Sequence, residues 1–257
     1  MPTHHRHDQV LALLTQSGEM TVEALAEELG VSRETVRRDL TQLGAAGKLR
    51  RFHGGARPIT ATSSVVDSES PFAHRLAQNA AAKRRIAAAA SRLFRPEDSL
   101  FIDTGSTTVV FAEALVAVPS LVTITNSPRI AATLASNSSH KVFLIGGAYG
   151  PDAGESLGPL ALEQIGKFRA RHAVLTIGAI DPTCVMDFDL QEAEVAKAMI
   201  ERADRVTVLA DSSKFDRRAV FEVVALGRIH TLVTDAPPSE PMARALAVAG
   251  TQLIIAR

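Results

Sequence analysis

The chain has 257 residues, of which 46% are hydrophobic, 4% aromatic and 22% charged, and its formal net charge at pH 7 is zero. This length favours two domains, no apolar run approaches the roughly 18 residues of a membrane span, and the N-terminus has no signal-peptide pattern. The single cysteine, Cys184, excludes an internal disulfide and suits a reducing compartment. We therefore expect a cytoplasmic protein that does not bind a membrane.

The zero net charge hides an uneven distribution. Residues 1–30 carry one basic residue against five acidic ones, whereas residues 31–57 carry seven basic residues against two acidic ones. A local positive patch is typical of a nucleic-acid contact. A solvated helix face would give the same count, so charge alone leaves both interpretations open.

Apolar spacing in the N-terminal part predicts three helices, at 6–16, 21–29 and 32–43. Gly30 supplies a tight turn between the second and third helices. The alternating residues 48–53 then predict a small basic β-wing. An ordinary three-helix bundle with a charged rim is the alternative interpretation.

Basic and hydroxyl side chains avoid the apolar stripe of the third helix, as a helix that enters the major groove requires. Arginine can form two hydrogen bonds with a guanine edge, although phosphate contacts are the commoner fate of such residues. The residues expected to contact DNA are Ser32, Arg33, Thr35, Arg37, Arg38, Arg50, Arg51 and His53.

Four motifs of this part, at 25–26, 29–32, 35–40 and 51–56, resemble the winged helix-turn-helix of DeoR-type bacterial transcriptional regulators. One departure is Gly44, where that family often has glutamate, but Gly44 lies away from the DNA-facing half of the helix. The resemblance implies a double-stranded DNA operator as partner.

The chain is expected to divide into a DNA-binding domain at 1–57, a linker at 58–79 and a second domain at 80–257. Residues 58–70 are rich in Ser, Thr and small residues, whereas 71–79 could also begin the next helix. The basic residues Arg75, Lys83, Arg84 and Arg85 could line the mouth of a ligand site or be exposed, and exposure is the favoured interpretation. Histidines near the N-terminus invite a metal interpretation, but no paired cysteines or supporting carboxylates accompany them in the sequence, so a disordered tail is favoured and no metal is expected.

Apolar runs alternate with helical patterns in the second domain, which predicts an α/β, Rossmann-like fold with a mainly parallel sheet covered on both faces. Strands are expected at 99–103, 121–125, 141–145, 172–177, 205–210, 220–226, 231–234 and 252–255. Helices are expected at 107–115, 128–136, 159–168, 191–203 and 241–249.

Ligands of such sheets bind beyond the carboxyl ends of the strands. The first strand is followed by the loop 103–108, whose glycine, hydroxyls and free N–H groups suit an anion; a simple helix cap is the alternative. The expected effector-binding residues are Asp103, Thr104, Gly105, Ser106, Thr107, Thr108, Asn126, Ser127, Gly146, Gly147, Gly178, Asp189, Glu192 and Lys214. Asp187 is expected to serve the dipole of the neighbouring helix. The G-x-G-x-x-G fingerprint is missing, and no cofactor is expected.

The second domain also resembles the DeoR family, in its effector-binding domain. The motifs lie at 103–108, 125–127, 145–147, 178–179, 189–200 and 210–215. That domain is similar to sugar-phosphate isomerases of the ribose-phosphate type, which implies a phosphorylated sugar or polyol as effector. The segment 180–186 departs from the family's usual glycine-containing loop.

We expect a transcriptional regulator, in the first place a repressor of carbohydrate genes, and not an enzyme. A single winged module reads few base pairs, so a homodimer or homotetramer is expected. Two alternatives stay open. One is a sugar-phosphate isomerase with an appended DNA module, using Asp103, Glu192 and Lys214 as acid–base groups. The other is a protein-interaction module with an inert α/β body.

Overall fold

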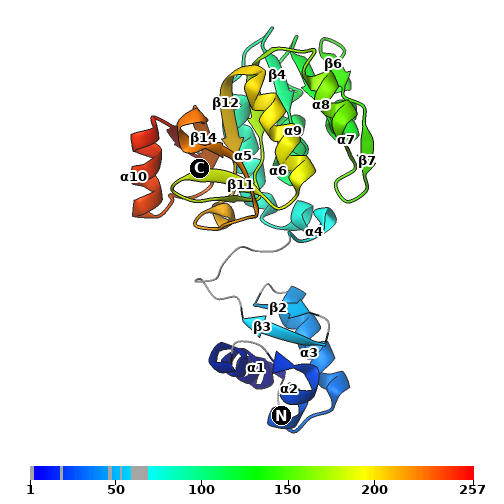
Figure 1. The fold of residues 1–257 in the computed structure, drawn as a ribbon, viewed down its shortest axis with the longest axis vertical. Helices are drawn as coiled ribbons and strands as arrows, with labels where there is room; N and C mark the ends of the chain where they lie inside the picture. Colours follow the sequence, from blue (N-terminus) through cyan, green and yellow to red (C-terminus); the bar gives the residue numbers. More distant parts are fainter. Residues whose placement is uncertain (1–2, 18–19, 46–47, 53, 59–68) are drawn as a thin grey trace. The chain divides into compact units, whose positions relative to one another are not determined.

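The computed structural model describes residues 3–17, 20–45, 48–52, 54–58 and 69–257. The chain divides into two compact units, Met1–Ser63 and Ser64–Arg257 (Figure 1). Each unit has a hydrophobic core of its own. The finer domain limits at 57 and 80 stay a prediction.

The N-terminal unit combines three helices with a small antiparallel sheet (Figure 1). The helices are α1 (Thr3–Ser17), α2 (Val22–Leu29) and α3 (Arg33–Ala45). The strands are β1 (Met20–Thr21), β2 (Leu49–Phe52) and β3 (Gly55–Pro58), in the order β1-β3-β2. The predicted helices and the wing are confirmed, and β1 is an additional strand that pairs with β3.

Local chemistry explains where α2 begins and ends. The Thr21 hydroxyl accepts the N–H of Ala24 at 3.1 Å and caps the first turn. Gly30 ends the helix at φ 61°, a left-handed conformation that glycine adopts without a steric penalty. The turn that follows allows the apolar stripe of α3, with Val36 and Leu40 at its centre, to pack into the same core.

The C-terminal unit is built on a seven-stranded sheet in the order β15-β14-β12-β9-β4-β5-β6, whose strand pairs are all parallel. Its strands are β4 (Ser99–Ile102), β5 (Val122–Thr125), β6 (Lys141–Leu144), β9 (Ala170–Leu175), β12 (Ala203–Leu209), β14 (Thr231–Thr234) and β15 (Gln252–Ile255). The predicted parallel sheet is confirmed.

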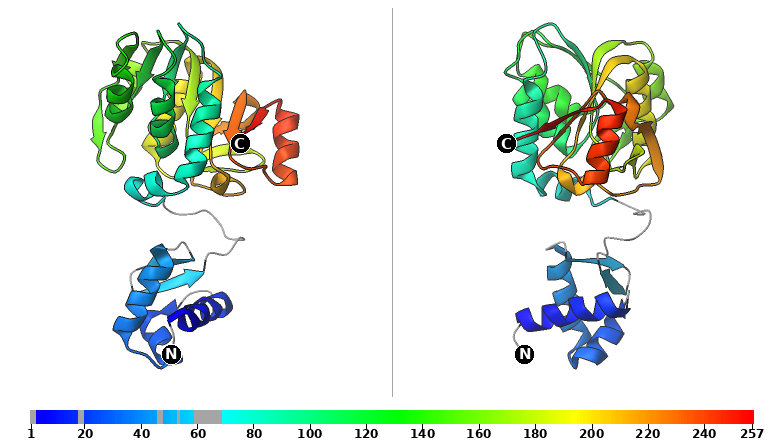
Figure 2. Two further views of the ribbon diagram at one scale, coloured as in Figure 1. Left: turned by 180° about the vertical axis from the view of Figure 1, so that it is seen from behind. Right: turned by 90° about the vertical axis from the view of Figure 1, so that its left-hand side faces the viewer.

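Helices cover both faces of this sheet (Figure 2). They are α5 (Ala80–Ser91), α6 (Ser106–Leu115), α7 (Pro128–Ala135), α8 (Pro159–Ile165), α9 (Leu190–Glu201) and α10 (Glu240–Ala249). Side chains alternate between two cores, since Leu100 and Ile102 of β4 pack with α5, α6 and α7, whereas Phe101 packs with α8 and α9. None of the described helices is long and apolar enough to cross a bilayer.

Three features differ from the sequence-based expectation. The strand expected at 220–226 lies outside the main sheet, because β13 (Phe221–Ala225) pairs antiparallel with β11 (Cys184–Asp187), which also pairs with β10 (Ala179–Ile180). A hairpin joins β7 (Ala148–Gly150) and β8 (Glu155–Leu157).

The third difference lies between 71 and 91. Instead of one helix there are two, α4 (Phe72–Ala77) and α5, separated by Asn79 in a left-handed conformation. The Lys83 ammonium donates to the backbone carbonyls of Arg75 and Gln78, which ties the end of α4 to α5. The short 3-10 turns η1 (Ser212–Lys214) and η2 (Leu226–Arg228) complete the unit.

Candidate functional site

The basic side chains that the sequence predicts for DNA contact lie on the exposed face of α3. The side chains of Arg33 and Arg37 are 66% and 58% exposed, and Arg38 is also exposed. Arg33 lies 3.6 Å from Glu23, and Arg37 lies 3.8 Å from Glu34. Exposed ion pairs contribute little free energy. Both guanidinium groups can therefore turn to phosphates at small cost.

Hydroxyl groups hold the start of α3. The Ser32 Oγ atom accepts the N–H of Thr35 at 3.2 Å and lies 2.9 Å from its hydroxyl. This cap places both predicted residues at the end of α3 whose free N–H groups attract a phosphate.

On the side of α3 opposite the exposed arginines, the buried carboxylate of Asp39 holds this helix in place. The sequence reasoning did not predict this residue. Asp39 is 2% exposed, receives two hydrogen bonds from Arg6 and lies 3.2 Å from the His7 ring. Burial opposes its charge, but the hydrogen bonds and the positive charge of Arg6 outweigh burial and lower the pKa of Asp39. The ion pair therefore fastens α1 to α3.

The wing strands place Arg50 opposite Arg57, and Arg51 opposite Ala56. The backbone thus puts Arg50 and Arg51 on a wing strand, as the sequence predicts. His53, the remaining predicted contact of the wing, lies outside the described residues.

In the C-terminal unit, the loop after β4 is fixed against β9. The buried Asp103 carboxylate accepts the N–H of Thr176 at 3.0 and 3.1 Å, and burial raises its pKa well above the ordinary value. A Cβ atom at Gly105 would lie 1.9 Å from the Thr176 hydroxyl, so only glycine fits there. Thr108 is fully buried and donates to the Gly105 carbonyl. These three residues shape the loop from within.

A buried hydrogen-bond chain supports the same loop from β5. The Thr104 hydroxyl donates to Asn126 Oδ1 at 3.0 Å, and Asn126 Nδ2 donates to Glu155 at 3.1 Å. Burial raises the pKa of Glu155 to about 7. Glu155 was not predicted, because it lies on the β7–β8 hairpin, which the sequence reasoning did not anticipate.

Three further predicted residues have structural contacts. Ser127 caps α7 by accepting the N–H of Ile130 at 3.4 Å. Gly146 forms two hydrogen bonds with the Gln164 side chain. A Cβ atom at Gly147 would lie 2.5 Å from the Leu157 carbonyl oxygen, so the close backbone approach requires glycine.

One pocket opens at the carboxyl ends of the central strands. Its lining residues are Glu69, Arg75, Thr104, Ser106, Thr107, Thr176, Ile177, Gly178, Asp187, Glu192, Leu209, Ala210, Asp211 and Lys214, and they define the effector pocket. Six of the predicted effector residues thus line one pocket: Thr104, Ser106, Thr107, Gly178, Glu192 and Lys214. Within the described part of the chain, no cluster of three or more His, Cys, Asp or Glu side chains could hold a metal ion.

The pocket contains one cation that the sequence reasoning placed at the surface. The side chain of Arg75 is only 13% exposed, because Phe72, Asp152 and Glu69 surround its guanidinium. Lys83 is also buried, at 3% exposure, whereas Arg84 and Arg85 are exposed. The expectation of exposure is therefore wrong for Arg75 and Lys83. Arg75 is one turn along a short helix that the sequence pattern did not separate from α5.

The carboxylates of the pocket repel one another. Burial, together with the neighbouring charges of Asp187 and Glu155, raises the pKa of Glu192 to about 9. Burial and the charge of Glu69 raise the pKa of Asp187 to about 6. Asp187 is therefore a lining residue, and the expectation that it merely serves the helix dipole is wrong.

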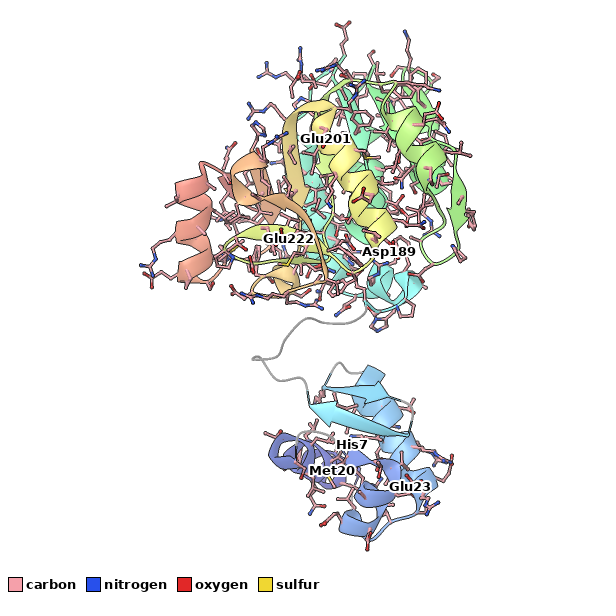
Figure 3. The ribbon with its side chains drawn as sticks, viewed as in Figure 1. His7, Met20, Glu23, Asp189, Glu201 and Glu222 are labelled. Atoms are coloured by element: carbon pink, nitrogen blue, oxygen red, sulfur yellow. The ribbon has the colours of Figure 1, made fainter. Side chains whose placement is uncertain are left out.

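The helix-capping role belongs instead to Asp189. Its carboxylate accepts the N–H groups of Gln191 and Glu192 at 2.7 and 3.2 Å. Figure 3 shows Asp189 where α9 begins and Glu201 where it ends. Asp189 is exposed and does not line the pocket.

Family models match both units. Residues 6–62 match a DeoR-like helix-turn-helix domain, and residues 78–236 match the DeoR C-terminal sensor domain.

Relatives in sequence agree with these matches. The HTH-type transcriptional repressor CsqR of Escherichia coli is 35% identical over 91% of this chain and 88% of its own length. The glycerol-3-phosphate regulon repressor of Escherichia coli is 33% identical over 93% of each chain. Among solved structures, ribose 5-phosphate isomerase A from Neisseria gonorrhoeae aligns over 53% of each chain with 17% identity and a TM-score of 0.39.

The family models cover most of the chain, and the relatives match it over nearly their whole length. The helix-turn-helix with its exposed arginines is the part that binds DNA, and the parallel α/β unit is the sensor. The chain belongs to the DeoR family of DNA-binding transcriptional regulators.

Proposed function

We propose that this regulator represses genes of carbohydrate metabolism and that a phosphorylated sugar or polyol controls it by binding in the effector pocket. A relative in Escherichia coli is named for the glycerol-3-phosphate regulon. A regulator of chromosomal genes works in the cytoplasm, which is where we place this chain.

The observation that carries this proposal is the mixture of groups in one pocket. Ser106 and Thr107 line it at the start of α6, where free N–H groups favour a phosphate. Arg75 and Lys214 supply positive charge. The carboxyls of Asp187 and Glu192, which also line the pocket, can form hydrogen bonds with the hydroxyls of a sugar or polyol.

A thermal-shift series tests the effector class. The compounds are sn-glycerol 3-phosphate, ribose 5-phosphate and fructose 6-phosphate, with glycerol, ribose and fructose as unphosphorylated controls. We expect at least one phosphorylated member to raise the unfolding temperature of the sensor unit and its parent compound to have no effect. A shift with the parent sugars alone would contradict the phosphate assignment.

DNA recognition is proposed for α3 and the wing in a homodimer or homotetramer. Two copies at a fixed spacing read a pseudo-palindromic operator, which one winged module is too small to specify. Analytical ultracentrifugation with and without operator DNA checks this, and a monomer on a single half-site would contradict it.

The sensor role is proposed in preference to an isomerase. An isomerase needs an ionised carboxylate to remove a proton from carbon, and Glu192, the predicted acid–base carboxyl that lines the pocket, has a pKa of about 9 and is protonated at neutral pH. A protonated Glu192 can donate a hydrogen bond to a ligand hydroxyl. Turnover of ribose 5-phosphate that disappears in Glu192→Gln would overturn the assignment.

A further inference from the structure

The carboxylate of Glu69 forms ion pairs with both positively charged side chains of the effector pocket, Arg75 and Lys214. One of its oxygens contacts the Lys214 ammonium, and the other lies 2.5 Å from Arg75. The side chains of Glu69, Arg75 and Lys214 are 14%, 13% and 17% exposed. All three line the pocket, so this ion pair fills part of the space that an effector would use.

The charge balance of the pocket makes this contact consequential. Among the described lining residues, the cations are Arg75 and Lys214, and the other charged groups are carboxyls. While Glu69 pairs with both cations, an incoming anion meets two positive side chains that are already in contact with a carboxylate. An incoming anion gains the full attraction of both cations only when the Glu69 carboxylate leaves.

Arg75 has partners other than Glu69 that hold it in place. Arg75 lies 3.4 Å from Asp152 and 5.3 Å from the centre of the Phe72 ring. The backbone N–H of Phe72 also donates to both Asp152 oxygens at 3.1 Å. Arg75 is thus held by α4 and Asp152 independently of Glu69, and it stays available to another anion.

The position of Glu69 in the chain links this contact to DNA binding. Glu69 directly follows residues 59–68, which connect it in sequence to the wing strand β3. A contact at Glu69 therefore anchors the start of the sensor unit to its own pocket. Displacing the contact would free that anchor point.

We propose that Glu69 is an internal occupant of an anion subsite formed by Arg75 and Lys214, and that the phosphate group of the effector replaces it. The inference rests on the proposed function for the identity of the effector. Effector binding then releases the chain at residue 69, which couples the pocket to the segment that carries the DNA-binding unit. By linkage, an anchored segment and a bound effector disfavour each other.

A different role for Glu69 predicts the opposite result. If Glu69 only positions Arg75 and Lys214 for the effector, its removal weakens anion binding. If Glu69 competes with the effector, its removal strengthens binding. Glu69→Gln therefore separates the two roles, and Glu201→Gln, which removes an exposed carboxylate at the far end of α9, controls for net charge.

Isothermal titration of the full-length variants with sn-glycerol 3-phosphate, ribose 5-phosphate and inorganic phosphate measures the effect. We expect Glu69→Gln to bind at least one phosphorylated probe about tenfold more tightly than wild type, the change for a contact formed in roughly nine-tenths of free molecules. Glu201→Gln should match wild type. Equal, weaker or absent binding of all three probes by Glu69→Gln would overturn the proposal.

A protease that cleaves after glutamate gives a second measurement. Cleavage between Glu69 and Ser70 should be slow in the free wild-type protein and faster with a saturating phosphorylated probe. Unchanged or slower cleavage in the complex would contradict the release of Glu69. In the titrations, tighter binding of inorganic phosphate alone would support the subsite and refute the sugar-phosphate assignment. Binding of a sugar phosphate by both proteins, with no probe bound more tightly by Glu69→Gln, would refute the subsite and support the sugar-phosphate assignment.

Discussion

The DNA-facing helix and the effector pocket use positive charge in opposite ways. On α3, Arg33 and Arg37 are more than half exposed and their acid partners Glu23 and Glu34 are 50% and 73% exposed. In the pocket, Arg75 and Lys214 are less than one-fifth exposed and share one carboxylate. Exposed arginines suit DNA, whose phosphates present many negative charges over a large surface. Shielded cations suit a small ligand that must compete for them, and this difference predicts effects of different size.

The largest expected effect is that of Lys214→Gln on effector binding. Removing a shielded cation from an anion site costs about 1.5–3 kcal/mol, which is roughly 10- to 150-fold in affinity. Titration with the tightest phosphorylated compound of the thermal-shift series measures it. An unchanged effector affinity would mean that the shielded cation Lys214 contributes no more to effector binding than an exposed arginine of α3 does.

Asp39→Asn tests the buried support of α3. Removing the charge of the buried Asp39 should cost about 2 kcal/mol in the free energy of unfolding of the N-terminal unit. Urea unfolding followed by a signal specific to the N-terminal unit, such as hydrogen exchange of α1 and α3, checks this. The sensor unit serves as the internal control, since its exchange should not change.

The pH dependence of that difference has a definite sign. Because the folded-state pKa of Asp39 is lowered, its stabilisation is complete above the unfolded value of about 3.9 and is lost as pH falls through the folded value. The gap between wild type and Asp39→Asn should therefore close in acid. A gap that is constant with pH would indicate that lost packing, not lost charge, causes the instability.

A smaller effect is expected for Arg37→Ala on operator affinity. Losing one phosphate contact weakens binding by several-fold and reduces the slope of log affinity against log salt by about one. A salt titration distinguishes this from a base contact, whose loss would relax specificity at one position. Effector affinity is the control and should not change.

The smallest effect is expected for Glu192→Gln at neutral pH. With a pKa of about 9, the wild-type side chain is already uncharged there, so effector affinity should change by less than about twofold. Above that pKa the wild-type carboxyl ionises and repels an anionic ligand, whereas glutamine does not. The variant should therefore bind more tightly in alkaline solution, and a large loss at neutral pH would contradict the protonated state.

Local patterns predicted the parts of both units that depend on local sequence. The helices of the DNA-binding unit follow from apolar spacing and from Gly30, and the loop 103–108 follows from the strand-to-helix rule. Asp39 escaped prediction because its partner Arg6 lies 33 residues away in the chain. Arg75 and Glu69 escaped prediction because Lys214, in the turn η1, is far from both in the sequence. Only the packing of α4 brings the three side chains together.

The same limit explains the predicted residues that do not line the pocket. Gly146, Gly147 and Ser127 follow strands and resemble ligand contacts in sequence, but tight backbone approach and helix capping account for them. A glycine or hydroxyl after a strand serves either purpose. Which purpose applies depends on neighbours that the sequence does not bring together.

The strand order has one consequence for how a ligand acts on the sensor. From β4 the chain proceeds outward through β5 and β6, then returns to β9 on the other side of β4 and proceeds outward through β12, β14 and β15. The pocket lies over this reversal and draws Ser106 from the first half and Lys214 from the second. A compound bound there bridges both halves of the sheet across their seam. It should therefore make them melt as one cooperative block, so that partial unfolding of either half is suppressed together with global unfolding.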